Sequence, residues 1–211
     1  MFLSGWLTVL VVGLIAVITP GPDFVLTLRS SLTHSRQAGI YTALGIGAGN
    51  LVHATYSLIG IGAIVSQSIL LFNLLKGLGA AYLIYVGIKS LRAQKTAVGI
   101  GTVRSNRRRI SRKAAFRIGF FGNLLNPKAT LFFLALFTQI VQPATPVLVQ
   151  AAYGVAIAAL ALIWFTLVAV WISQAGIKAR LEACSHWLER LAGVVLVTFG
   201  VRLAVAELNQ Q

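Results

Sequence analysis

Acidic residues are scarce in this chain of 211 residues, which has four Asp and Glu against 18 Lys and Arg. In a soluble protein, the resulting formal net charge of +14 would suggest a nucleic-acid partner. Here the basic residues lie between long apolar segments, and no surface that interleaves aromatic and basic residues is evident. We therefore interpret the charge as a signal of membrane topology and expect no nucleic acid to bind.

Cysteine and clustered metal ligands are also scarce. The single cysteine, Cys184, excludes an intrachain disulfide and a cysteine-based metal cluster. The sequence contains neither the paired carboxylates of a hydrolytic centre nor a set of His and Cys residues that would indicate a metal site. It also lacks the Walker lysine motif that would indicate ATP hydrolysis. We expect no catalytic residue, no metal and no cofactor, so the chain is predicted not to be an enzyme, and active transport would draw on a gradient.

Apolar residues make up 57% of the chain, and only 10% of the residues are charged. Soluble domains contain about 25% charged residues. Apolar runs of about 20 residues, the length that crosses a bilayer core, recur along the chain. The sequence predicts an all-α membrane protein of six spans, the first of which reads as a retained helix rather than a signal peptide. The expected spans run from about Phe2 to Thr27, Ile40 to Val65, Leu70 to Leu91, Phe116 to Val141, Val147 to Ile172 and Leu191 to Leu208.

The basic residues concentrate in alternate connections between these spans. They lie between spans one and two, three and four, and five and six, whereas the connections at Ser66–Ile69 and Gln142–Pro146 have none. By the positive-inside rule, the three basic connections face the cytoplasm. We therefore expect a multi-pass protein with both termini on the periplasmic or extracellular side.

The long connection between spans three and four divides the chain into two similar halves. We expect a first three-helix repeat at 1–92, a basic cytoplasmic loop at 93–115 and a second three-helix repeat at 116–211. Because each half has an odd number of spans, the second copy would enter the membrane in the opposite direction. The arginine run at 107–109 is either a topology anchor or a site of attraction for anionic membrane lipids.

Spans one and four carry matching helix breakers. Span one contains Pro20, Gly21 and Pro22, and span four contains Asn126 followed by Pro127. Proline lacks a backbone donor and clashes with the preceding turn, so each site should break its helix. Such breaks could be ordinary proline kinks. Broken helices at corresponding places in two halves are also the best sequence indication of a transporter's binding site, which is the interpretation that we favour.

Each break carries one charged residue. Asp23 is the only acid that lies deep in a span, where a carboxylate tends to face a cavity, a partner or a proton path. It could exchange a proton for the ammonium group of a substrate, or it could serve only as a helix cap. Lys128 follows the second break and could bind a substrate carboxylate with the helix start, reach to an interface or pair with Asp23. Together the two residues would match the two ends of a zwitterion.

Span two carries two polar residues at membrane depth. Asn50 and His53 are three positions apart and so share one helix face. The preceding Gly45 and Gly49 permit close approach of another helix. His53 could relay protons or form an interhelical hydrogen bond. Two further residues, Asn123 and Gln139, are candidates to line the same cavity.

These motifs also resemble a known family. Thr19–Phe24, Gly45–His53, Gly79–Gly87 and Asn123–Ala129 follow in the order and spacing of the LysE/RhtB amino-acid exporters. Asp at position 23 looks like the threonine and homoserine export branch. The resemblance implies efflux of amino acids across the bacterial inner membrane, by exchange with protons. It places in the functional core Pro20, Gly21, Pro22, Asp23, Asn126, Pro127 and Lys128.

Other classes of function remain open at this stage. The same resemblance extends loosely to ion exporters, and a passive channel is a further alternative. A cation route should present several acids or a filter of carbonyl groups, and only Asp23 lies deep. A membrane scaffold would leave the matched breaks unexplained. Gly77, Gly79 and Gly87 could let span three pack against a helix of the same chain or of a second copy, so a homodimer is open as well.

Overall fold

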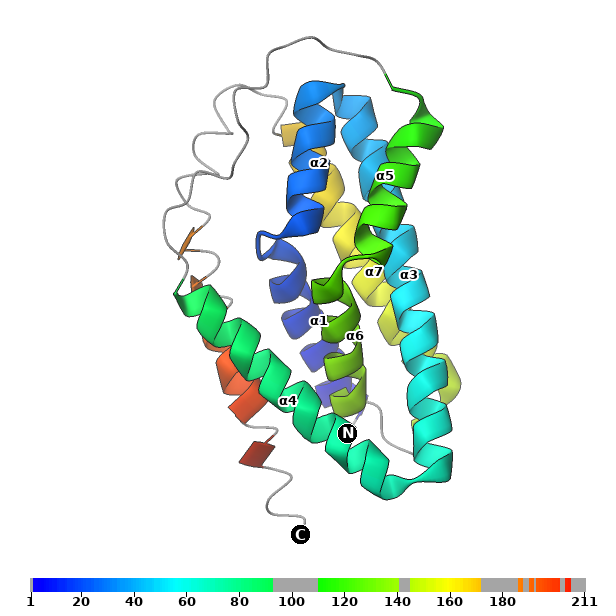
Figure 1. Cartoon of the computed structure of the whole chain (residues 1–211), viewed down its shortest axis with the longest axis vertical. Helices are drawn as coiled ribbons and strands as arrows, with labels where there is room; N and C mark the ends of the chain where they lie inside the picture. The colour runs from blue at the N-terminus through cyan, green and yellow to red at the C-terminus, as the bar shows by residue number, and fades with distance from the viewer. Residues whose placement is uncertain are drawn as a thin grey trace.

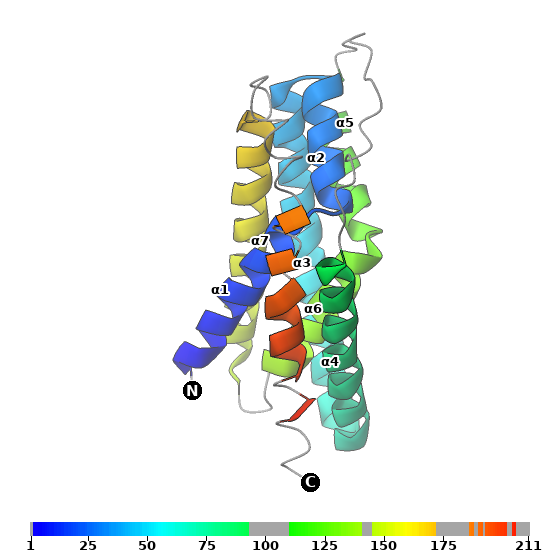
Figure 2. The same ribbon diagram turned by 90° about the vertical axis from the view of Figure 1, so that its left-hand side faces the viewer.

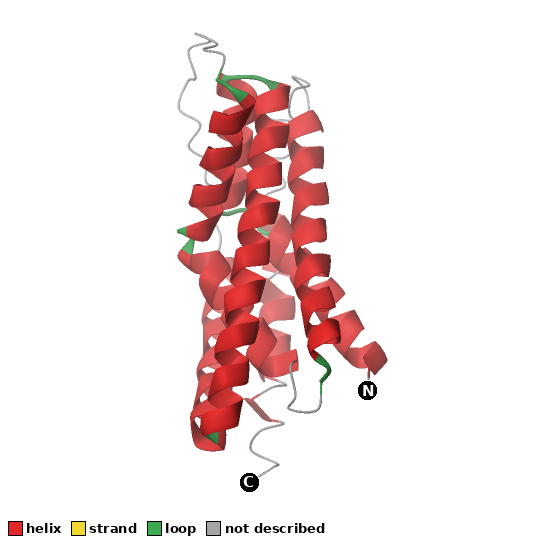
Figure 3. Ribbon diagram, turned by 90° about the vertical axis from the view of Figure 1, so that its right-hand side faces the viewer, coloured by secondary structure: helices red, strands yellow, loops and turns green. Residues whose placement is uncertain are grey.

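The structure is a computed structural model that describes residues 2–92, 110–140 and 145–171, together with 186–187, 190–191, 193–201 and 204–205. Within these ranges it is all helical, without a strand (Figure 3). The long helices are α1 (Phe2–Ile18), α2 (Pro22–Thr33), α3 (Arg36–Gln67), α4 (Ile69–Leu91), α5 (Arg112–Leu124), α6 (Pro127–Ile140) and α7 (Val147–Trp171). The all-helical class predicted from the sequence is confirmed for this part of the chain.

Three helices contain stretches that are long and apolar enough to cross a membrane, at Arg36–Ala63, Asn73–Leu91 and Val147–Trp171. Two bent pairs also qualify when each is taken as one span. Gly5–Ile18 and Pro22–Thr33 meet at 53°, and Arg112–Leu124 and Pro127–Ile140 meet at 56°. The described residues therefore contain three to five candidate spans. The predicted sixth, from about Leu191 to Leu208, lies partly outside the described residues.

The surface of the bundle suits a lipid environment. Large apolar side chains are exposed on several helices, including Leu7 at 65%, Ile59 at 68% and Leu70 at 78%. Soluble monomers rarely expose apolar surface so extensively. The end of α2 and the starts of α3 and α5 lie together at the top of Figure 1, and Arg36, Arg112 and Lys113 belong to these helix ends. Some basic residues of two predicted cytoplasmic connections thus lie at this end of the bundle, whereas α4, with Lys89 in its last turn, ends at about mid-height on the left of Figure 1.

Helices α3 and α7 pack against each other along the middle of the bundle (Figures 1 and 2). The half-helix α5 packs on α3, while α1 packs on α7, and α2 contacts both central helices. Helix α6 packs against α3 and α4. The breaks between α1 and α2 and between α5 and α6 therefore lie side by side at mid-height, next to the central helices (Figure 1).

Glycines let α3 and α5 approach closely, as the sequence predicts. A side chain at Gly45 would collide with the backbone of Phe116 and Phe120, and one at Gly119 would collide with Thr42. The Thr42 hydroxyl donates a hydrogen bond to the Ala115 carbonyl across this contact, at 3.2 Å. The N-terminal parts of α3 and α5 thus pack with their backbones in close contact.

The glycines of α4 have different surroundings. Gly79 lies against Ala135 and Thr138 of α6, and Gly87 lies against the described residues Gly193 and Val197. A methyl group at Gly77 would meet no atom of the described residues within 4 Å, so this glycine borders open space. Two of the three glycines that could have served a homodimer therefore pack within the chain.

Candidate functional site

The first break ends α1 and starts α2 within three residues. Helix α1 stops at Ile18 because Pro20 has no N–H to continue the ladder, and Gly21 then takes an extended conformation with φ of −171°. Pro22 begins α2 at a position where its missing donor costs nothing. Asp23 is therefore the second residue of α2, in the first turn, where the helix dipole favours a carboxylate.

The second break repeats this design with a different cap. Helix α5 ends at Leu124, and Pro127 begins α6. The Asn126 side chain caps α6, because its Oδ1 accepts a hydrogen bond from the backbone N–H of Lys128 at 3.0 Å. Lys128 is the second residue of α6, the position that Asp23 occupies in α2.

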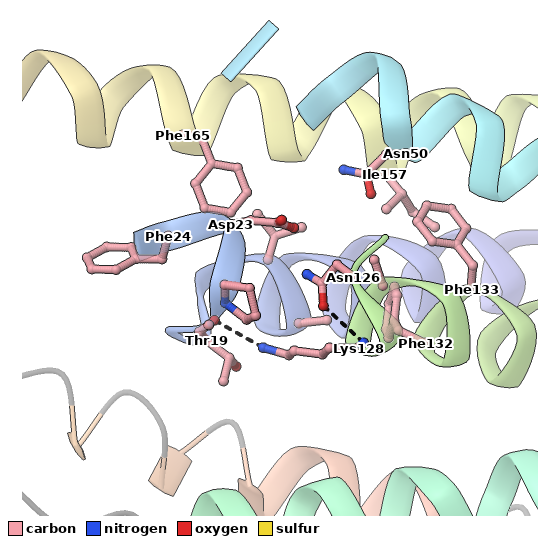
Figure 4. Close-up of a pocket in the computed structure, with 15 residues that line it drawn as sticks. Thr19, Asp23, Phe24, Asn50, Asn126, Lys128, Phe132, Phe133, Ile157 and Phe165 are labelled. Atoms are coloured by element: carbon pink, nitrogen blue, oxygen red, sulfur yellow. Dashed lines mark hydrogen bonds between the residues drawn. The ribbon is translucent and has the colours of Figure 1, made fainter. Parts of the chain in front are cut away.

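A pocket lies between the two breaks and the central helices (Figure 4). Its empty volume is about 470 Å³, including the part that is open to solvent. The polar residues of the lining, which we call the polar wall, are Thr19, Asp23, Asn50, Asn126 and Lys128. The rest is mainly apolar and aromatic, and includes Phe24, Phe132, Phe133, Ile157 and Phe165.

Lys128 reaches across the pocket from the second break to the first. Its Nζ donates a hydrogen bond at 3.2 Å to the carbonyl of Thr19, the residue that follows the end of α1 (Figure 4). A side chain at Gly21 would stand 3.2 Å from this nitrogen, so the glycine leaves room for the lysine. An ammonium group at the end of α1 also complements the negative end of that helix dipole.

Asp23 is held from the opposite direction. The Asn123 amide nitrogen donates a hydrogen bond to Asp23 Oδ2 at 2.9 Å and a longer one to Asn50 Oδ1 at 3.3 Å. The Lys128 ammonium attracts the Asp23 carboxylate, and the Asn126 side chain also faces it (Figure 4). The acid and the base at the two breaks therefore share one pocket.

His53 lies behind this network and is fully buried. Its Nε2 lies 3.0 Å from the Asn123 carbonyl oxygen, to which it must donate, and its Nδ1 pairs with the Tyr56 hydroxyl. In a neutral ring, Nδ1 then accepts from tyrosine. The Phe133 ring stacks on the imidazole with centroids 5.7 Å apart. The interhelical hydrogen bond predicted as one alternative for His53 is thus present.

The structure brings most of the predicted residues together. Six of the nine candidates line the pocket, namely Gly21, Pro22, Asp23, Asn50, Asn126 and Lys128. Pro20 and Pro127 lie at the breaks. His53 does not line the pocket, but it hydrogen-bonds to Asn123, which in turn donates to the lining residue Asp23. Among the described residues, no group of three or more His, Cys, Asp or Glu side chains is placed to hold a metal.

Sequence reasoning missed the aromatic wall and gave Asn123 too little weight. Phe132 and Phe165 come from long apolar runs in which nothing marks the residues that face a cavity. Asn123 had a usable signal, because it is an amide residue in an apolar segment, three positions before the Asn126-Pro127 helix breaker. A polar residue of this kind needs a partner, and the candidates at the other break are few.

A polar pocket between two broken apolar helices at mid-bundle is the architecture of a membrane translocator. Comparison with known proteins agrees: the chain belongs to the LysE type translocator family, with a match over residues 14–207. It is 28% identical over 203 residues to the threonine efflux protein of Escherichia coli K12, a match that covers 95% of this chain and 98% of the relative.

Two further relatives cover different parts of the chain. The homoserine/homoserine lactone efflux protein of Salmonella typhimurium is 33% identical over 145 residues, covering 69% of this chain and 68% of the relative. The uncharacterized membrane protein YrhP of Bacillus subtilis is 28% identical over 197 residues, covering 90% and 93%. No solved structure matches the chain significantly.

Proposed function

We propose that this protein exports neutral amino acids across the bacterial inner membrane in exchange for protons. Membership of the LysE type translocator family supports transport, and the relatives named for threonine and homoserine efflux support an amino-acid substrate. The observation that carries the proposal is the placement of one acid and one base in a single pocket between two helix breaks.

The polar wall fits the two ends of an amino acid. In this proposal, Asp23 binds the substrate ammonium group, while Lys128 and the positive start of α6 bind the carboxylate. Both side chains already contact polar groups of the opposite half, Asn123 and Thr19. A zwitterion would replace or share these contacts without leaving a buried charge alone, which would be costly.

The apolar wall selects a neutral side chain. Phe24, Phe132 and Phe165 offer no partner to a third charge, and burying an unpaired charge is costly. A small uncharged side chain such as that of threonine, homoserine or leucine brings no charge to this wall, so its burial costs much less than that of a charged side chain. Lysine would bring a second ammonium group next to Lys128 and should be excluded.

Proton exchange follows from the chemistry of a lone carboxyl group. Asp23 can neutralise one positive charge at a time, either a proton or a substrate ammonium group. Release of substrate on one side and of a proton on the other would then couple the two fluxes. Transport would use the pH gradient as its energy source.

Helix packing supports the inverted-repeat architecture as part of this proposal. If α1, α2 and α3 correspond to α5, α6 and α7, the contact of α1 with α7 mirrors that of α5 with α3. The contact of α2 with α7 likewise mirrors that of α6 with α3. A twofold axis in the membrane plane would produce these two pairings, although the contact of α2 with α3 has no counterpart of similar extent between α6 and α7. In this proposal the basic connections lie on the cytoplasmic side and the termini on the other.

Export from preloaded proteoliposomes tests the proposal. Labelled threonine, homoserine, leucine and lysine are followed with and without a pH gradient. The variants are Asp23→Asn and Lys128→Ala, with Lys89→Ala at the exposed end of α4 as a matched control. We expect gradient-driven export of the neutral substrates that falls by about 10- to 100-fold in both site variants, the value of one hydrogen bond to a charged group.

Each alternative predicts a different result. An ion exporter would move cations and no amino acid under any gradient, and a passive channel would equilibrate substrate equally with and without the gradient. Either pattern would overturn the proposed function. Size-exclusion profiles of the variants in detergent serve as the folding control.

A further inference from the structure

Asn123 joins three helices behind the pocket. It lies in the last turn of α5 and is fully buried. Its amide nitrogen points to Asp23 on α2 and to Asn50 on α3, at 2.9 and 3.3 Å. Since an amide NH₂ group has two hydrogens, both are used by these two acceptors.

The surroundings fix the orientation of this amide. A flipped amide would place Asn123 Oδ1 against the Asp23 carboxylate, which is also an acceptor, so only the nitrogen can face the acid. Gly49 leaves the space that the side chain fills, because a side chain there would collide with Asn123. His53 holds the Asn123 backbone carbonyl at 3.0 Å. The amide donor is therefore positioned from both its backbone and its side chain.

The two oxygens of Asp23 are consequently different. Oδ2 accepts the hydrogen bond from Asn123, whereas Oδ1 is buried and accepts no bond of hydrogen-bond geometry from the described residues, although the Asn126 side chain faces the carboxylate. A buried acceptor without a donor is costly, typically by about 1–3 kcal/mol and by more for a charged group. Oδ2 therefore has a hydrogen-bond donor from the protein, whereas Oδ1 can still accept a hydrogen bond.

We propose that Asn123 is a positioning residue that anchors Asp23 Oδ2 and thereby reserves Oδ1 as the one atom that receives either a proton or the substrate ammonium group. The inference rests on the proposed function for the identity of the exchanged partners. It extends that function by separating the roles of the two carboxylate oxygens. Asn123 acts through Asp23 and touches neither proton nor substrate.

The other break shows the same principle with the opposite charge. Lys128 is held by the Thr19 carbonyl, at the end of the half-helix that precedes Asp23. Each charged residue at a helix start is thus held by a polar group at the end of the half-helix from the other repeat. Asn123 and the Thr19 carbonyl are counterparts in this arrangement.

Other titratable groups near Asp23 are few among the described residues. Lys128 on α6 and His53 on α3 face it, while α1, α5 and α7 present Thr19, Asn123 and Phe165, which do not titrate. The comparison below is therefore repeated in a His53→Gln background, which removes the described imidazole near Asp23 together with its hydrogen bond to the Asn123 carbonyl. If loss of the Asn123 donor shifts the titration midpoint of Asp23 in this background as well, the shift does not depend on His53.

Infrared difference spectroscopy of the purified full chain during a pH titration tests the proposal. The chain has only four acidic residues, so the protonated-carboxyl band is simple, and its Asp23 component is assigned with Asp23→Asn. We compare wild type with Asn123→Leu, which has the same branching without the donor. Loss of the donor weakens the charged form of Asp23, so its titration midpoint should move up by about one to two pH units.

The control is Thr138→Val, a buried hydroxyl on α6 that donates to a carbonyl of its own helix at 2.9 Å. It should keep the wild-type midpoint. An Asn123→Leu midpoint equal to that of wild type would overturn the proposal. If Asn123→Leu does not fold, Asn123→Asp places a second carboxyl group against Asp23. Two coupled titration steps then support the contact, and two independent ones overturn it.

Export kinetics separate this inference from the proposed function. In Asn123→Leu, a freely rotating carboxylate should raise the KM for threonine by about tenfold while Asp23 stays present. If wild type exports amino acids but neither the midpoint nor the KM changes in the variant, the role of Asn123 is wrong and the exporter stands. If wild type exports no amino acid but the midpoint still moves, the exporter fails and the anchoring of Oδ2 stands.

Discussion

Asp23 and Lys128 occupy equivalent positions, since each is the second residue of a helix that begins with proline directly after a break. Each side chain reaches the opposite half of the chain, Asp23 through Asn123 and Lys128 through the Thr19 carbonyl. The two oppositely charged side chains therefore each connect one half of the chain to the other at the pocket. A dipolar substrate would compete with both contacts at once, which links its binding to loosening of the two breaks.

Replacement of Lys128 tests the carboxylate end of the pocket. Lys128→Met keeps much of the aliphatic stem but removes the ammonium group, so the KM for threonine export should rise by about 10- to 100-fold. Lys128→Arg keeps the charge but has a planar, wider head group, so it should restore export only in part. Initial rates over a range of internal substrate concentrations give these values. An unchanged KM in Lys128→Met would contradict the assignment.

The close packing between α3 and α5 should contribute to the stability of the folded protein. Gly45→Ala should destabilise the protein by about 1–3 kcal/mol, because the added methyl group collides with the backbone at Phe116 and Phe120. Gly60→Ala is the matched control on the same helix, since no atom of the described residues lies within 4 Å of the new methyl group. Alanine has the higher helix propensity, so the control should be neutral or slightly stabilised. Thermal unfolding in detergent compares the two, and equal stability would rule out the tight contact.

Much of the helical framework could be predicted from sequence because its boundaries have local causes. The expected spans at Leu70–Leu91 and Val147–Ile172 agree with α4 and α7 to within one residue at each end. Both breaks fall at the predicted prolines. By contrast, α5 begins at Arg112 inside the predicted loop, because Ser111 accepts a hydrogen bond from Ala114 and caps the helix. That cap is a local signal that hydropathy alone does not contain.

The partners within the site could not be predicted, because they depend on which helix faces meet. Asp23 and Asn123 are separated by 100 positions, and no periodicity within one helix specifies such a pair. The aromatic wall is similar, since Phe132 and Phe165 look like ordinary lipid-facing or core residues in their own segments. The six-span count, the inverted repeat and the orientation in the membrane stay predictions.

Orientation in the membrane is testable with the single cysteine removed. In a Cys184→Ser background, Gln37→Cys lies beside Arg36 at the start of α3, and Val147→Cys lies 75% exposed after a connection without basic residues. A membrane-impermeant maleimide should label Val147→Cys in intact spheroplasts and Gln37→Cys only after permeabilisation. The reverse pattern would overturn the proposed orientation and place the basic ends outside.

Replacement of Phe132 tests which substrate side chains the protein prefers, because its ring lines the apolar wall of the pocket. Phe132→Leu removes ring volume next to the substrate side chain and should cost less stability than the about 3–5 kcal/mol of a Phe→Ala change. Larger apolar side chains then gain contact area, and one methylene in such a pocket is worth about tenfold or more. The ratio of kcat/KM for leucine over threonine should therefore rise by about tenfold.

The matched control for this change is Phe137→Leu, further along α6. Phe137 is fully buried but does not line the pocket, so its replacement loosens the core without widening the site. Export of leucine and threonine should then change in the same proportion. If both variants alter the ratio equally, the effect comes from general loosening of the bundle, and Phe132 does not set specificity. If only Phe132→Leu alters it, the aromatic wall contacts the substrate side chain, as expected for a zwitterion whose charged ends are bound by Asp23 and Lys128.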